Sequence, residues 1–155
     1  MFGKILVPLD GSKHSLKALE QAGEIAEKFS GRITLIHAYS LSVQPIMLPE
    51  PSALSSPAIP ILSGEELSKI AEATRAVGKR ILDDGEEKLR PRKVKVEKML
   101  VEGHAVEEIV KAANEGNYDL IVIGARGISH IREILLGSVT DGVIHHARCP
   151  VLVIK

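Results

Sequence analysis

The sequence has few of the residues on which several large classes of protein depend. It has one cysteine, Cys149, which excludes an internal disulfide and fits a reducing compartment. It has no tryptophan, two Phe and two Tyr, and its formal net charge is zero. Nucleic-acid binding through a basic face with stacking aromatic side chains is therefore disfavoured. The apolar run near Met1 is too short for a signal peptide and no stretch is long enough to span a bilayer, so we expect a soluble cytoplasmic protein without membrane contact.

Recognisable catalytic and metal-binding motifs are also missing. The six histidines show no His-x-x-x-His or Cys/His spacing, and His145 and His146 point to different sides of a predicted helix. The Walker A pattern for nucleotide hydrolysis is absent. Cys149 has no evident electropositive partner in the sequence, so we interpret it as a buried, unreactive thiol.

The order of apolar patterns predicts an α/β fold. Short apolar runs at 4–9, 32–38, 118–123 and 151–154 indicate buried strands, and the alternation at 93–101 indicates a strand at a sheet edge. Helical spacing separates these runs, which predicts a doubly wound, five-stranded parallel sheet in a Rossmann-like three-layer α/β/α arrangement. The length of 155 residues fits a single domain over residues 1–155.

Two helices carry specific expectations. The first, after residue 12, has an apolar face of Leu16, Leu19, Ala22, Ala26 and Phe29. The second opens with a capping box at Ser63 and Glu66. Its predicted inward-facing residues are Leu67, Ile70, Thr74, Val77 and Ile81.

The segment from residue 39 to residue 63 has a different composition. It holds five of the eight prolines and shows no helical or strand period. A loop of this length within one domain is usually functional, disordered or both. We expect a mobile excursion rather than a domain boundary.

A glycine pattern near the C-terminus gives the strongest functional signal. Gly124 and Gly127 follow a predicted strand, and nine residues later Gly137 and Ser138 precede a predicted helix. Backbone amides and the positive end of a helix at such a place can hold an anion, most often a phosphate. Gly allows close approach of the main chain, and Ser138 would add a hydroxyl while capping the helix. The alternative, that these glycines only make tight turns, stays open because G-x-x-G alone is a weak motif.

Other candidate residues lie where further strands end. In doubly wound sheets, ligands bind beyond the carboxyl ends of the strands, where the strand order reverses. Asp10 would then lie beside the glycine loop, placed for a ribose hydroxyl, an adenine amino group or a metal. Arg126 is interpreted as a phosphate clamp, with an exposed loop arginine as the alternative. His37 either borders this site or belongs to the core.

These motifs together resemble the universal stress protein family, specifically its ATP-binding branch. The resemblance covers nearly the whole chain, including residues 5–12, 35–38, 103–105, 119–127, 134–140 and 149–154. The family pattern G, two residues, G, nine residues, G and then S or T fits Gly124, Gly127, Gly137 and Ser138.

The resemblance also implies a set of residue roles. Pro8, Asp10 and Ala38 would border the adenine and ribose, with Ile123 beside them. Those implied to wrap the ribose and phosphates are Gly124, Arg126, Gly127, Gly137, Ser138, Val139 and Thr140. The implied ligand is ATP, AMP or ADP, with Mg²⁺ held through Asp10 when ATP is bound. The family resemblance further implies a homodimer through the last strand, residues 151–154.

Three functions from different classes follow. The first is a nucleotide-dependent regulatory module of the stress response, whose state is read by an unidentified protein partner. The alternative is a slow ATPase or another ATP-using enzyme built on the same cleft. The third, a nucleotide-free scaffolding protein, is disfavoured by the intact glycine pattern. We expect no catalytic residues, and at most slow ATP hydrolysis.

Overall fold

The fold is described by a computed structural model covering residues 2–41, 63–128 and 136–155. Over these ranges strands and helices alternate along the chain. The elements are β1 (Lys4–Pro8), α1 (Lys13–Phe29), β2 (Arg32–Tyr39), α2 (Gly64–Leu89), a 3₁₀ turn (Arg90–Arg92), β3 (Lys95–Glu102), α3 (Ala105–Glu115), β4 (Leu120–Gly124), α4 (Ser138–His146) and β5 (Val151–Ile154).

The strands form one parallel sheet in the order β3-β2-β1-β4-β5. The predicted doubly wound, five-stranded parallel fold is confirmed. β3 lies at one edge, as its alternating sequence predicted, and β5 lies at the other. The strand order reverses between β1 and β4, because the chain first winds outward through β2 and β3 and then returns to the other side of β1.

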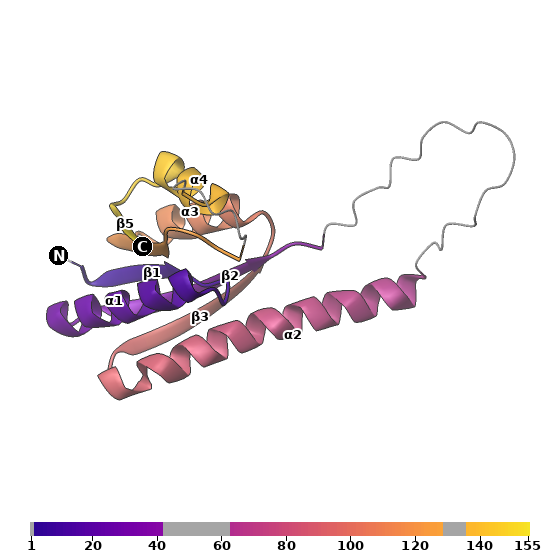
Figure 1. The fold of residues 1–155 in the computed structure, drawn as a ribbon, viewed down its shortest axis with the longest axis horizontal. Coiled ribbons are helices and arrows are strands. Elements are labelled where there is room, and N and C mark those ends of the chain that lie inside the picture. The colour runs from indigo at the N-terminus through magenta and orange to yellow at the C-terminus, as the bar shows by residue number, and fades with distance from the viewer. Residues whose placement is uncertain (1, 42–62, 129–135) are drawn as a thin grey trace, which may run out of the picture.

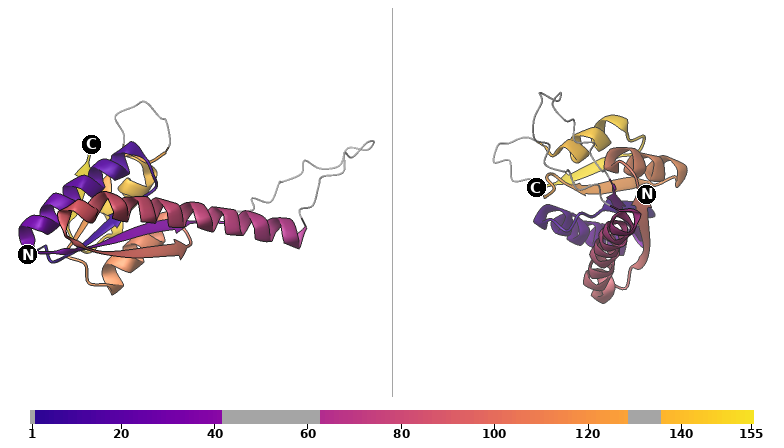
Figure 2. Two further views of the ribbon diagram at one scale, coloured as in Figure 1. Left: turned by 90° about the horizontal axis from the view of Figure 1, so that it is seen from below. Right: turned by 90° about the vertical axis from the view of Figure 1, so that its right-hand side faces the viewer.

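Helices cover both faces of the sheet (Figure 1, Figure 2). Alternate side chains of β1 point to opposite faces, so Ile5 and Val7 join one core and Leu6 joins the other. The first core includes Leu19 of α1 and Leu82 of α2. The second core packs Leu6 against residues of α3 and α4, among them Ile109 and Val143.

Helix α1 follows the sequence prediction except at its end. Its N-cap is Ser12, and Ser30 ends it in the left-handed conformation. Ala18, Leu19, Ala22 and Ala26 are buried, as the apolar spacing predicted for three of them. Phe29, predicted to face inward, is 44% exposed, and its ring packs edge-on against Phe2 with 5.5 Å between centroids. The prediction for Phe29 was wrong because the last turn of α1 meets the N-terminal residues rather than the core.

The capping box that opens α2 is confirmed, whereas the predicted inward face is confirmed at Ile81, which packs on the first core, and is wrong for three of its other residues. Both reciprocal hydrogen bonds between Ser63 and Glu66 are present. The buried residues of α2 all lie in its second half: Gly78, Leu82, Gly85 and Leu89. Leu67, Ile70 and Val77 are instead 38%, 49% and 59% exposed.

The sheet beneath α2 ends before the helix does, which explains this difference. Figures 1 and 2 show the N-terminal half of α2 extending past the body of the molecule. The second half is held on β3, where the Lys98 ammonium contacts Asp83 at 2.8 Å and Glu86 at 2.6 Å. These two carboxylates raise the pKa of Lys98 above its ordinary value. The helix is therefore anchored at one end and projects at the other.

Two further expectations concern the loop predicted at residues 39–63 and membrane-spanning segments. Most of the predicted excursion at 39–63, namely residues 42–62, lies outside the described residues; β2 extends to Tyr39 and α2 begins at Gly64. None of the described helices is both long enough and apolar enough to cross a membrane.

The uneven anchoring of α2 predicts unequal costs of truncating its side chains. Leu82→Ala removes a side chain that is 2% exposed and should lower the free energy of unfolding by about 2–5 kcal/mol. Val77→Ala lies in the exposed part of the helix and should change it by no more than about 0.5 kcal/mol. Urea denaturation of the two variants measures both values. Equal losses would contradict the burial assigned to the two halves of α2.

Candidate functional site

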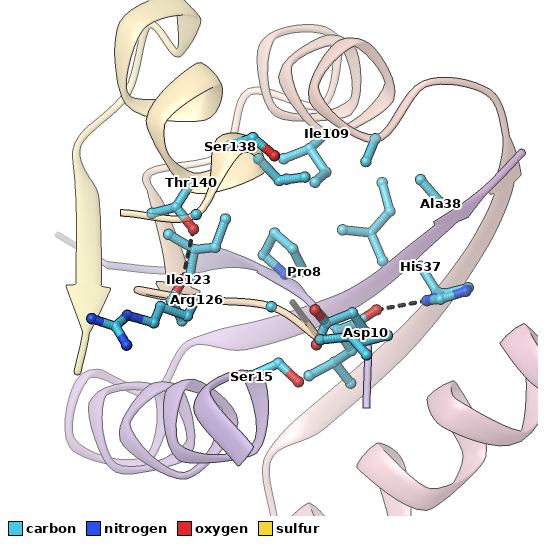
Figure 3. A pocket seen from close by; sticks show the side chains of 18 residues that line it. Pro8, Asp10, Ser15, His37, Ala38, Ile109, Ile123, Arg126, Ser138 and Thr140 are labelled. Atoms are coloured by element: carbon cyan, nitrogen blue, oxygen red, sulfur yellow. Dashed lines mark hydrogen bonds between the residues drawn. The ribbon is translucent and has the colours of Figure 1, made fainter. Parts of the chain in front are cut away.

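A pocket of about 220 Å³ opens at the carboxyl ends of β1 and β4, where the strand order reverses. Figure 3 shows the side chains that converge there from β1, β2, β4, α3 and α4. The structure places every sequence-predicted site residue in the lining: Pro8, Asp10, Ala38, Ile123, Gly124, Arg126, Gly127, Gly137, Ser138, Val139 and Thr140. These residues come from four separate parts of the chain, and the parallel sheet brings them together.

The turn from β1 into α1 forms one side of the pocket. Asp10 organises this turn, because its Oδ1 accepts a hydrogen bond of 2.9 Å from the backbone N–H of Ser12. Gly11 between them has φ +80°, a conformation that side chains disfavour. Ser12 in turn caps α1 by accepting from the N–H of Ser15 at 3.2 Å. The Asp10 carboxylate is thereby held at the edge of the pocket.

The glycine loop after β4 lies directly against Asp10. A Cβ on Gly127 would lie 2.6 Å from Oδ2 of Asp10, closer than real Cβ atoms approach. The described glycines with positive φ are Gly11 and Gly103. Gly127 is not among them, so its backbone conformation does not itself require glycine. Glycine is needed at 127 because the carboxylate of Asp10 occupies the neighbouring space.

Gly124 lines the pocket and is also required for packing. A Cβ at this position would lie 2.6 Å from the backbone carbonyl carbon of His14 in α1. The last residue of β4 therefore has to be glycine for α1 to sit this close to the sheet. The signature glycines at 124 and 127 thus have different physical roles.

The start of α4 forms the opposite side of the pocket and is fixed to the end of β4. The hydroxyl of Thr140, which is 3% exposed, donates to the carbonyl of Gly124 at 2.7 Å. The N–H of Gly137 donates to the carbonyl of Ala125 at 2.8 Å. These two bonds hold the first turn of α4 over the pocket, with the amides that begin the helix at its mouth.

Ser138 does not cap α4 as the sequence suggested. The N-cap is Gly137, and no side-chain hydrogen bond caps the helix among the described residues. Ser138 is the first helical residue, and Figure 3 shows its hydroxyl beside the cavity near Ile109. The N-terminal amides of α4 are therefore satisfied by no capping side chain of the described chain.

The inner wall of the pocket is apolar. Pro8, Ile123 and Val139 line it, together with residues outside the predicted set: Leu9, Ile36, Ala105 and Ile109. Ser15 and the exposed Ile128 also border the pocket. Ala105 and Ile109 belong to α3, whose helical spacing was visible but whose position over the pocket depends on the sheet order. The pocket thus combines an apolar slot with a rim of backbone amides and one carboxylate.

His37 and Arg126 take positions that the sequence left open. His37 lines the pocket and contacts the carbonyl of Leu9 through Nδ1 at 2.7 Å, so this nitrogen carries the proton. The backbone of Arg126 also belongs to the lining, but Figure 3 shows its guanidinium turned away from the cavity. The role of Arg126 as a phosphate clamp stays a prediction.

The remaining chemical candidates lie away from this pocket. Cys149 is partly buried among residues of the second core, and burial raises the pKa of its thiol above the ordinary value. A protonated thiol is a poor nucleophile, in agreement with the inert role expected. No group of three or more His, Cys, Asp or Glu side chains able to hold a metal occurs within the described ranges.

Comparisons with known proteins agree on one family. The model of the universal stress protein family matches residues 1–155. The universal stress protein YxiE of Bacillus subtilis is 32% identical over 155 residues, covering 100% of both chains. The solved structure of MJ0577 from Methanocaldococcus jannaschii is 28% identical with a TM-score of 0.81, covering 100% of this chain and 96% of that one. A universal stress protein from Archaeoglobus fulgidus, solved in complex with dAMP, is 25% identical with a TM-score of 0.64 and covers 100% of both chains.

The buried Thr140 bond predicts a test of how the pocket is held together. Thr140→Val keeps the shape but leaves the carbonyl of Gly124 without this donor, which should lower the free energy of unfolding by about 1–3 kcal/mol. Thr140→Ser keeps the hydroxyl and should retain most of the stability. Thermal denaturation of the pair is the measurement. A Val variant as stable as the Ser variant would show that this bond does not fix α4.

Proposed function

The chain belongs to the universal stress protein family, and we propose that it binds an adenine nucleotide in the pocket between β1 and β4. The observation that carries the proposal is the composition of this single pocket. An apolar slot sized for a heterocycle ends at the glycine loop and at the uncapped amides of α4. A nucleotide has the same division, with a flat base at one end and phosphates at the other.

The base and ribose are assigned to the side of the pocket formed by β1, β2 and β4. Pro8, Ala38 and Ile123 supply apolar contacts for an adenine ring, and the Asp10 carboxylate lies where ribose hydroxyls would need an acceptor. The Archaeoglobus fulgidus relative, solved with dAMP, supports adenine as the base class. Its ligand is a monophosphate, so the assignment of ATP is part of the proposal.

The phosphates are assigned to the glycine loop and the start of α4. Backbone N–H groups at a helix N-terminus favour an anion by hydrogen bonding and by the helix dipole. Gly127, Gly137, Ser138, Val139 and Thr140 border this end of the pocket. Because Arg126 points away from the cavity, phosphate binding here depends on main-chain amides.

Asp10 is the residue through which Mg²⁺ would be held with ATP. It supplies the one carboxylate among the described pocket residues, and Mg²⁺ commonly binds one or two carboxylates plus substrate phosphates. Its Oδ1 already accepts from Ser12, which leaves Oδ2, facing Gly127, for a metal or a ribose hydroxyl. One carboxylate alone is a weak metal site, so Mg²⁺ would arrive with the nucleotide.

A regulatory binding module fits this site better than an efficient ATPase. Efficient phosphoryl transfer needs a group that orients water, a metal clamp and a cation on the transferring phosphate. In the described lining, Asp10 is the one carboxylate and is already assigned to Mg²⁺ or the ribose, and Arg126 is turned outward. We propose that bound nucleotide sets the state of a surface read by a protein partner, with slow hydrolysis as the alternative.

Gly127→Val is the variant that tests nucleotide binding. The new side chain would meet the Asp10 carboxylate and enter the proposed phosphate path, so ATP affinity should fall at least tenfold, or about 1.4 kcal/mol. Gly64→Val is the control, because nothing lies within 4 Å of a Cβ there. Isothermal titration calorimetry with ATP and AMP, each with Mg²⁺ and with EDTA, gives the affinities.

The same titrations separate two roles for Asp10 when repeated on Asp10→Ala. A ribose contact predicts weaker AMP binding even in EDTA, whereas a role only through Mg²⁺ predicts unchanged AMP binding. Unchanged ATP affinity in a folded Gly127→Val protein would place the site elsewhere.

We also propose that the protein forms a homodimer through β5. This strand is short, apolar and at the edge of the sheet, so one row of its backbone groups has no strand beside it within the described chain. Leu152 is 37% exposed there, while Val151 and Val153 pack on the second core. Antiparallel pairing with a second β5 about a two-fold axis would satisfy the backbone and cover Leu152.

Leu152→Lys should convert this dimer to a monomer. The new lysine ammonium would lie close to the same group of the second copy near the two-fold axis, and the two charges would repel each other. The core would not be disturbed. Glu97→Lys, which places lysine on the exposed edge strand β3, is the matched control and should leave the mass unchanged. Light scattering at micromolar concentration measures both. A monomeric parent chain under these conditions would refute the β5 dimer.

A further inference from the structure

The projecting half of α2 carries an apolar stripe formed by Leu67, Ile70, Thr74 and Val77. Leu67, Ile70 and Val77 are exposed and Thr74 is partly exposed. The steps of three, four and three residues place all four on one line along the helix, the spacing of a two-helix seam. The line continues into Ile81, which packs on the core and lies over Gly11. The stripe therefore begins at the body of the molecule and runs outward along the projecting helix.

We propose that this stripe pairs with the same stripe of a second copy of the chain, with the two α2 helices antiparallel. The neighbouring residues Ala71 and Ala73 are small, so another helix can approach closely. A partner with the same spacing would cover the stripe along its length. A helix of the same sequence meets that requirement.

The direction of pairing follows from the shape of the molecule and the charges. In Figures 1 and 2 the helix projects by its N-terminal half, so antiparallel overlap keeps the two bodies at opposite ends. Leu67 then faces Val77 of the copy, and Ile70 faces Thr74. This register brings Glu66 beside Arg80 of the copy, and opposite charges at such flanking positions favour a pairing. Parallel pairing would instead place the two bodies side by side and would not bring Glu66 beside Arg80.

This contact shares no residue with the proposed β5 interface or with the pocket, so its test does not depend on either proposal. α2 packs over β2 and β3, whereas β5 forms the opposite edge of the sheet. Each contact is self-complementary, so a chain that makes both would join dimers into larger assemblies. The overlap spans about three helical turns, so we expect association that depends on protein concentration.

Ile70→Glu tests the contact, with Ala76→Glu as its control. Both residues are exposed in the same half of α2, but Ala76 lies outside the stripe, about half a turn away. Sedimentation equilibrium over a concentration series should show the weight-average mass of Ile70→Glu falling to half that of the parent at high concentration. Ala76→Glu should match the parent, and circular dichroism should show equal helix content. The halving is measured in a Leu152→Lys background, where the α2 contact is the one proposed contact that remains; with β5 pairing intact, the two contacts would build larger assemblies and the mass would fall by more than half.

Cysteine cross-linking tests the antiparallel direction in a Cys149→Ser background. Ala73→Cys lies near the proposed two-fold axis and should form a disulfide-linked dimer on oxidation. Leu67→Cys lies about ten residues from its counterpart in the antiparallel register, roughly 15 Å along the helix, and should remain largely monomeric on denaturing gels. Cross-linking through Leu67 would overturn the antiparallel arrangement. A parent mass equal to that of Ile70→Glu at every concentration would overturn the pairing itself, leaving the stripe to another part of the chain or to another partner.

Discussion

The parallel pairing of β1 on both of its sides is the constraint on which the rest of the molecule depends. β1 pairs with β2 over all five of its residues and with β4 through Ile5 and Leu6. The chain leaves β1 toward α1 on one face and leaves β4 toward α4 on the other. Two neighbouring strands from which the chain winds off in opposite directions leave a crevice between their carboxyl ends, and in this sheet the strand order reverses between β1 and β4. The pocket is therefore a consequence of strand order.

Within that crevice, hydrogen bonds from a few side chains hold the backbone of the loops in place. Asp10 holds the turn after β1, and the Thr140 hydroxyl ties α4 to the end of β4. The signature glycines make these contacts possible by different means. Gly124 lets α1 approach the sheet, Gly127 leaves room for the Asp10 carboxylate, and Gly137 contributes its N–H to the loop closure. The glycine pattern that indicates phosphate binding is therefore also required for the packing of the loop against its neighbours.

The sequence predicted the sheet well because its signals are local. Buried parallel strands appear as short apolar runs, and the capping box at Ser63 and Glu66 needs only four residues. The candidate pocket residues were predictable because strand ends meet at one edge. The exposure of Ile70 and Val77 was not, since helical spacing gives a face but not the length of sheet beneath it. The N-cap at Gly137 and the outward turn of Arg126 depend on tertiary contacts that no spacing records.

The anchored half of α2 connects the projecting half to the wall of the pocket. Gly78 lies against His37 and Leu100 so closely that a Cβ there would come within 2.7 Å of both side chains. His37 in turn donates from Nδ1 to the carbonyl of Leu9, the residue before Asp10. A displacement of α2 along the sheet would press on His37, whose hydrogen bond to Leu9 ties it to the segment after β1 that carries Asp10. Because cores are close-packed, such contacts transmit shifts rather than absorb them. The exposed helix half and the pocket are therefore two ends of one packed unit, although no residue is common to both surfaces.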